Sequence, residues 1–143
     1  MRKAPKKILV SLKEAASAEE LISLATHVAA DKAPITILNV NEIPEPTPLD
    51  ADDPALDQEA RAVEQAVKRL ARRYRGRRLL LRLARARHAG RAIVEELKEG
   101  KYDLAVIGYH HKRSLGELLL GTTAQYLARH APCRLLMCVP PKP

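Results

Sequence analysis

The segment from Gly108 to Thr123 holds the residues of this chain best suited to chemistry. Gly108 directly follows a predicted strand, and Gly121 directly precedes a predicted helix. Glycine at a strand end lets the backbone approach a ligand, and a helix start offers free N–H groups and a positive dipole end to an anion. The polar side chains of the segment are His110, His111, Lys112, Arg113, Thr122 and Thr123. This pattern predicts a site for an anion such as a phosphate group.

No catalytic constellation accompanies this segment. The adjacent His110 and His111 point in different directions and have no Cys or acid at ligand spacing, so we expect no metal site. Cys133 and Cys138 are too far apart along one extended strand for a disulfide, which suits free thiols in a reducing cytosol. Neither has a partnered base nearby in the sequence. We therefore expect a protein that is not an enzyme.

Charge is distributed unevenly along the 143 residues, which carry a formal net charge of +8. Glu42–Glu64 is mostly acidic, whereas Lys68–Arg91 is rich in arginine. Such a chain attracts anions. It has neither Phe nor Trp for base stacking and matches no nucleic-acid-binding motif, so we expect no specific nucleic-acid partner. Ordinary surface charge, an anion site and a protein-docking surface stay open as explanations of the basic residues.

The hydrophobic pattern alternates strands and helices. Continuous apolar runs of strand length, typical of strands buried on both faces, occur at 7–12, 35–40, 78–84, 102–107 and 134–139. Helical patterns follow a capping box at Ser17–Glu20 and then cover 56–74, 88–98 and 121–129. Gly100 is the predicted stop of the third helix, and a polar loop is expected after Gly108. The arginines of 78–84 favour a sheet edge for that strand.

This alternation predicts an α/β fold with right-handed crossovers and a parallel sheet covered by helices on both faces. We expect a single domain over 1–143, with the proline-rich, acidic segment 41–55 as a flexible loop. The sequence has no apolar run long enough to span a membrane and no signal peptide at its start, so we expect a cytoplasmic protein.

The C-terminal third resembles the universal stress protein family. The resemblance rests on Leu119-Leu120-Gly121-Thr122, then on the run from Tyr126 to Cys133, and on the first strand at Lys7–Val10. It implies a three-layer α/β/α fold of the adenine nucleotide α hydrolase-like type. The five parallel strands would lie in the order 3-2-1-4-5.

Two residues depart from that family's nucleotide-binding pattern, Gly-x2-Gly-x9-Gly-Ser/Thr. Gly108 and Gly121-Thr122 fill its first and last positions, but His111 stands where the middle glycine belongs. A bulky residue in a left-handed backbone costs about 1–2 kcal/mol, so the loop is expected to take another path. Lys13 occupies the place of the family's aspartate, which contacts the nucleoside, and a donor cannot replace that acceptor. Both changes point away from standard ATP binding, yet they leave a positive cluster suited to phosphate.

The resemblance implies a non-catalytic, stress-responsive regulatory domain with no required cofactor. Its expected ligand is an adenine nucleotide such as ATP or AMP, or a related phosphate compound. The expected site comprises Ser11, Lys13, Val40, Asn41, Gly108, His110, His111, Lys112, Arg113, Gly121, Thr122 and Thr123. A homodimer through the last strand, 134–139, is also implied. The alternative is a nucleotide-free protein-interaction module, for instance the cytosolic regulatory domain of a membrane transporter.

Overall fold

The computed structural model describes residues 3–108, 112–114, 117–119 and 121–139, with the backbone alone described for 112–114 and 117–119. Its strands are β1 (Ile8–Ser11), β2 (Ile35–Glu42), β3 (Leu79–Ala86), β4 (Leu104–Gly108), β5 (Lys112–Ser114), β6 (Glu117–Leu119) and β7 (Arg134–Cys138). Its α-helices are α1 (Ala18–Val28), α2 (Pro54–Arg73), α3 (Ala89–Gly100) and α4 (Thr122–His130), and a short 3₁₀ helix, η1 (Ala15–Ser17), precedes α1. The described residues contain no helix long and apolar enough to cross a membrane.

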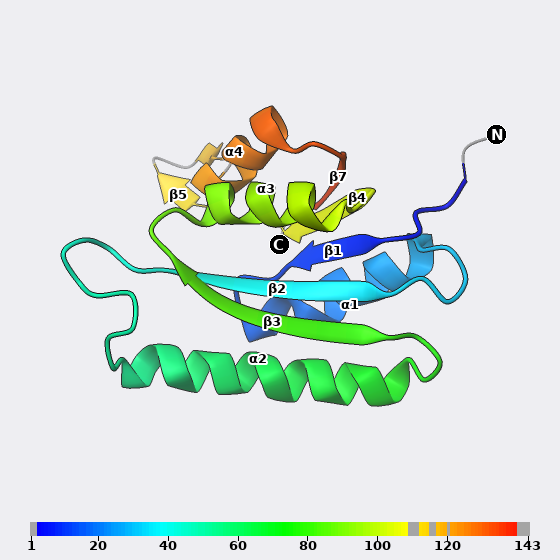
Figure 1. The fold of residues 1–143 in the computed structure, drawn as a ribbon, viewed down its shortest axis with the longest axis horizontal. Coiled ribbons are helices and arrows are strands. Elements are labelled where there is room, and N and C mark those ends of the chain that lie inside the picture. The colour runs from blue at the N-terminus through cyan, green and yellow to red at the C-terminus, as the bar shows by residue number, and fades with distance from the viewer. Residues whose placement is uncertain (1–2, 109–111, 115–116, 120, 140–143) are drawn as a thin grey trace.

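Five strands form one parallel sheet in the order β3-β2-β1-β4-β7. This confirms the predicted order 3-2-1-4-5 and the placement of the arginine-containing strand at an edge. The chain moves outward from β1 to β3, then crosses back to β4 beside β1 (Figure 1). The direction of winding therefore changes between β1 and β4.

The sheet is buried between two helical layers, each with its own apolar core. Ile8 and Val10 of β1 pack on one face with residues of α1 and α2, while Leu9 packs on the opposite face with residues of α3 and α4. Figure 1 shows α3 and α4 on the near side of the sheet and α1 behind it. Successive β1 side chains are apolar because both of its faces are covered.

The strands differ in length at their carboxyl ends. Ser11, the last residue of β1, pairs with Leu38, whereas β2 continues four residues further, to Glu42. β3 follows β2 to the end, with Ala86 opposite Glu42. The carboxyl edge therefore steps back at β1, beside the point where the winding direction changes.

Three local predictions are wrong. Ser17 does not cap α1 through its side chain, because η1 gives it helical dihedrals, and its hydroxyl donates to Glu14 at 3.3 Å instead. Gly100 is the last residue of α3 but does not supply its left-handed cap, since Lys101 takes that conformation with φ of 53°. The predicted polar loop after Gly108 contains an antiparallel pair of short strands, β5 and β6, which is separate from the main sheet.

Two arginines of β3 and its C-terminal extension anchor the proline-rich loop between β2 and α2. Arg87 donates to the carbonyls of Ile43, Pro44 and Thr47 at 3.1, 3.2 and 2.6 Å. Arg85 donates to the carbonyls of Leu49 and Ala51 at 3.1 and 2.6 Å. At the end of this loop, the Asp53 side chain caps α2 by accepting from the N–H groups of residues 55 and 56. The expected flexibility of this loop stays a prediction.

Candidate functional site

The predicted site residues that the structure describes converge on the carboxyl edge of the sheet. Ser11 ends β1 and Gly108 ends β4, and these two strands are paired neighbours. Val40 and Asn41 lie on the part of β2 that extends past β1, and all four are half-buried. Ligands of open parallel sheets bind beyond this edge, where the winding direction changes.

Asn39, which the sequence analysis did not select, holds the backbone that follows β1. Its buried side chain donates to the carbonyls of Leu12 at 2.8 Å and Lys13 at 3.3 Å. Its Oδ1 accepts from the Nδ2 of Asn41 at 3.2 Å. This arrangement fixes the chain at the step in the sheet edge and leaves the Lys13 side chain exposed. A polar residue within the apolar run 35–40 was the signal that could have revealed it.

The start of α4 supplies the second part of the site. α4 connects the carboxyl end of β4 to the start of β7, so its N-terminus lies at the carboxyl edge. Gly121 precedes it with φ of −62°, and no side chain among the described residues caps it. A Cβ added at Gly121 would meet no described atom within 4 Å. Thr122 is exposed and Thr123 half-buried, and the first N–H groups of a helix have no partner within the helix.

The side chains of the remaining predicted site residues are not described by the structure. His110 and His111 lie outside the described residues, and Lys112 and Arg113 are described only as part of the backbone of β5. Another histidine has a structural role: His88 caps α3 through Nδ1, which accepts from the N–H of Arg91 at 3.0 Å. No group of three or more His, Cys, Asp or Glu suited to a metal occurs among the described residues.

Both cysteines are free and held in the protonated form. Burial raises the pKa of Cys138 to about 11, helped by its hydrogen bond to Glu20 at 3.1 Å and by the charge of that carboxylate. Burial, and secondarily the charge of Asp103, also raises the pKa of Cys133. Since the thiolate is the reactive form, these thiols are poor nucleophiles at neutral pH.

We expect Cys138 to resist alkylation. A pKa of about 11 instead of an ordinary 9.0 leaves about 100-fold less thiolate at pH 8. Glu20→Gln removes the carboxylate charge, so the pKa should fall and alkylation by iodoacetamide should become faster. Peptide mass spectrometry over a time course measures each cysteine separately, and Cys133 is the internal control. Equal Cys138 rates in the two proteins would contradict the assigned role of Glu20.

A model of the universal stress protein family matches residues 5–139. The chain belongs to the universal stress protein family. The predicted fold and the resemblance noted in the sequence are therefore confirmed.

Solved structures of other universal stress proteins share the fold. The UspA protein from Lactobacillus plantarum is 22% identical, with a TM-score of 0.68 over 95% of this chain and 99% of that one. A universal stress protein in complex with cAMP is 18% identical, with a TM-score of 0.66 over 96% and 98% of the two chains. A family protein from Arabidopsis thaliana with AMP bound is 16% identical, with a TM-score of 0.62 over 96% and 93%. No curated protein sequence matches the chain, and these comparisons give no support to a transporter domain.

This universal stress protein uses much of its arginine-rich stretch internally. Besides Arg85 and Arg87, Arg73 pairs with Glu19 at 2.7 Å, and Arg82 pairs with Glu96. Arg77 donates to the carbonyls of residues 30 and 33, both at 3.0 Å. These contacts give structural roles to five arginines of the stretch, Arg73, Arg77, Arg82, Arg85 and Arg87. The expectation of no specific nucleic-acid partner stays a prediction.

Proposed function

We propose that this universal stress protein is a non-catalytic regulatory domain that binds an adenine nucleotide, or a related phosphate ligand, at the carboxyl edge between β1 and β4. The observation that carries the proposal is the start of α4. There, no described side chain caps α4 and no described atom lies within 4 Å of a Cβ added at Gly121, at the same edge as exposed Lys13. A helix N-terminus and a nearby lysine are suited to a phosphate group.

Related structures support the ligand class. Family members with 18% and 16% identity are in complex with cAMP and with AMP bound. Lys13 stands where the family's aspartate contacts the nucleoside, so the ligand here should be held chiefly through its phosphate. AMP, ATP or cAMP should therefore bind, whereas adenosine, which has no phosphate, should bind poorly.

Isothermal titration calorimetry with AMP, ATP, cAMP and adenosine tests this proposal. Lys13→Ala should weaken AMP binding roughly 10- to 150-fold, because a charge-assisted hydrogen bond contributes about 1.5–3 kcal/mol. Gly121→Val should also weaken it, since a Cβ there meets no described atom within 4 Å and the added side chain would occupy space proposed for the ligand. Lys98→Ala, an exposed lysine near the C-terminus of α3, is the matched control and should leave the affinity unchanged.

Two outcomes would reject the proposal. The first is no heat with any nucleotide at millimolar concentration, which would favour the nucleotide-free interaction module. The second is equal loss from Lys13→Ala and Lys98→Ala, which would show that general charge, and not this edge, holds the nucleotide.

The proposal extends to a cytoplasmic homodimer. β3 and β7 are the two edge strands of the sheet, and the β7 residues Leu135–Cys138 are half-buried. An apolar edge strand invites pairing with a second chain. Light scattering at tens of micromolar should give the mass of a dimer, and a monomer there would contradict this part of the proposal.

A further inference from the structure

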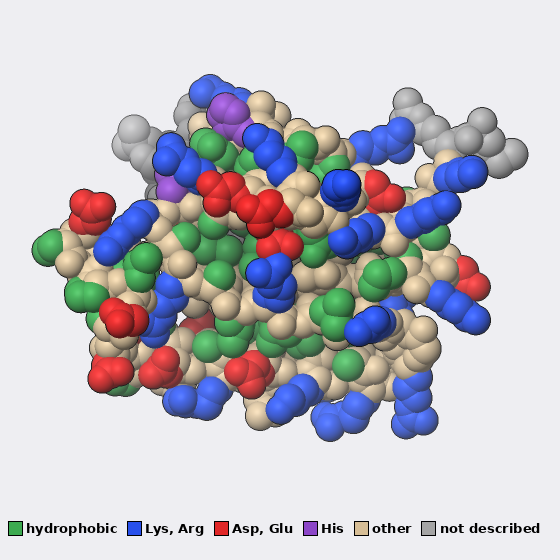
Figure 2. All heavy atoms as spheres, in the orientation of Figure 1, with side chains coloured by type: hydrophobic (Ala, Val, Ile, Leu, Met, Phe, Trp, Pro, Cys, Tyr) green, Lys and Arg blue, Asp and Glu red, His purple; other side chains and the backbone are tan. Residues whose placement is uncertain are grey.

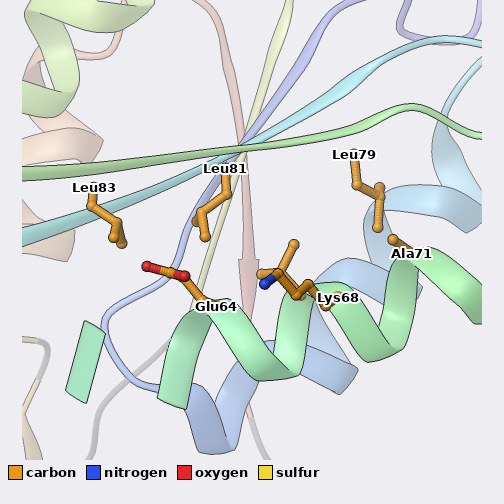
Figure 3. A pocket seen from close by; sticks show the side chains of 7 residues that line it. Glu64, Lys68, Ala71, Leu79, Leu81 and Leu83 are labelled. Carbon is orange, nitrogen blue, oxygen red and sulfur yellow. The ribbon is translucent and has the colours of Figure 1, made fainter. Parts of the chain in front are cut away.

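An apolar groove of about 410 Å³ lies at the β3 edge, away from the nucleotide site. Leu79, Leu81 and Leu83 point from β3 toward α2, as Figure 3 shows. Leu83 is 43% exposed, so part of this apolar lining is open to solvent on a terminal strand. Apolar surface on an edge strand is suited to contact with another chain.

Opposite charges flank this groove on α2. Glu64 lies below Leu83 and Leu81, and Lys68 lies one turn further, toward Leu79 (Figure 3). In Figure 2, acidic side chains gather over the N-terminal half of α2 and basic ones over its C-terminal half, below a band of exposed hydrophobic side chains. No ion pair joins Glu64 to Lys68 among the described residues, whose ion pairs are Arg73–Glu19, Arg82–Glu96 and Arg85–Asp57.

The order of the side chains in this groove is reciprocal. In Figure 3, Leu81 lies between Leu79 and Leu83 on β3, and Glu64 and Lys68 lie on either side of it on α2. A two-fold axis running across the groove at Leu81 would place Leu79 opposite Leu83 of a second copy and each carboxylate opposite the other copy's ammonium group. An isologous contact requires this reciprocity, since residue i meets j and j meets i.

We propose that the α2–β3 groove is a self-association surface. The groove of one copy docks antiparallel on the same groove of a second copy. The leucines supply the apolar centre, and the two Glu64–Lys68 contacts fix the register. The 20 residues of α2 span about 30 Å. Small interfaces form weak, concentration-dependent complexes, so association is expected only at high protein concentration.

This surface is independent of the edge at β7. The two are terminal strands on opposite sides of the sheet, so one contact leaves the other accessible. Two isologous contacts on opposite edges can build an open chain. The weight-average mass is therefore the quantity to measure, whether or not the β7 dimer forms.

Charge reversal followed by mixing tests the proposal. In Glu64→Lys alone, both contacts become ammonium against ammonium, and in Lys68→Glu alone they become carboxylate against carboxylate. Each variant should associate at least about tenfold more weakly than the unmodified protein, measured by sedimentation equilibrium up to several hundred micromolar. In an equimolar mixture of the two variants every contact is again oppositely charged, so the mass should return to that of the unmodified protein.

The mixture separates association from effects within one chain. Glu64 and Lys68 are also i, i+4 neighbours, and a change in helix stability cannot be restored by adding another variant. Circular dichroism verifies that both variants are folded, and Leu83→Asn should weaken association without changing charge. The proposal is overturned if both variants and their mixture have the mass of the unmodified protein. It is also overturned if mixing restores nothing, because the restored opposite charges then do not hold two copies together.

Discussion

Replacing Asn39 by leucine should lower the free energy of unfolding by about 2–4 kcal/mol. Leucine is branched at Cγ like asparagine but cannot donate to the carbonyls of Leu12 and Lys13, which Asn39 Nδ2 binds at 2.8 and 3.3 Å. A buried acceptor left without a donor costs about 1–3 kcal/mol. Urea denaturation measures the loss directly.

Asn41→Leu is the matched control for this substitution. Asn41 is half-buried and makes one side-chain hydrogen bond to Asn39, at 3.2 Å, so its loss should cost about 1 kcal/mol or less. Because Asn39 positions the chain around Lys13, Asn39→Leu should also weaken AMP binding. Equal stabilities of the two variants would show that the Asn39 hydrogen bonds do not hold this part of the chain.

Gly100→Ala should destabilise the protein by about 1–3 kcal/mol, although alanine is the better helix former. Gly100 is the last residue of α3, and a Cβ there would lie 2.2 Å from Cε2 of Tyr102. The Tyr102 ring is buried, with the Lys7 ammonium 4.8 Å from its centroid and its hydroxyl bound to Glu96 at 3.3 Å. The ring must therefore move, and these contacts weaken.

Thermal and urea unfolding in a double-mutant cycle test this explanation. In a Tyr102→Leu background the obstructing ring is gone, so Gly100→Ala should become neutral or stabilising. If Gly100→Ala is equally harmful in both backgrounds, the contact with Tyr102 is not the reason for glycine at this position.

The sequence predicted the elements well because their signals are local. The apolar run 7–12 and the β-branched run 35–40 became β1 and β2, and Pro54 at the start of α2 extended the predicted helix by only two residues. Strand order came from the family resemblance, since periodicity does not reveal which strands are neighbours.

The wrong predictions at helix ends share a physical reason, which is side-chain contact that the end motifs do not record. Glu20 was assigned to a capping box, yet it accepts from Cys138, 118 residues away. Gly100 looked like a helix stop, but it is glycine because Tyr102 leaves no room for a Cβ. The groove at β3 likewise depends on how α2 packs against Leu79, Leu81 and Leu83, which no single segment of sequence encodes.

The site itself was predicted only in outline. Ser11, Asn41 and Gly108 were expected at one edge, and the structure places them there. Asn39 was missed because its signal, a polar residue within an apolar run, does not reveal which backbone carbonyls its side chain binds. His110 and His111 lie outside the described residues, so their roles stay predictions.

The most direct test of the central claim is a titration of the ¹⁵N-labelled protein with AMP, followed by two-dimensional NMR. Nucleotide binding at the carboxyl edge predicts chemical-shift changes for the amides of Ser11, Lys13, Asn41, Gly108 and 121–123. The amides of α2 and β3, at the far edge, should stay unchanged. Shifts confined to the basic half of α2, or no shifts at millimolar AMP, would contradict the claim.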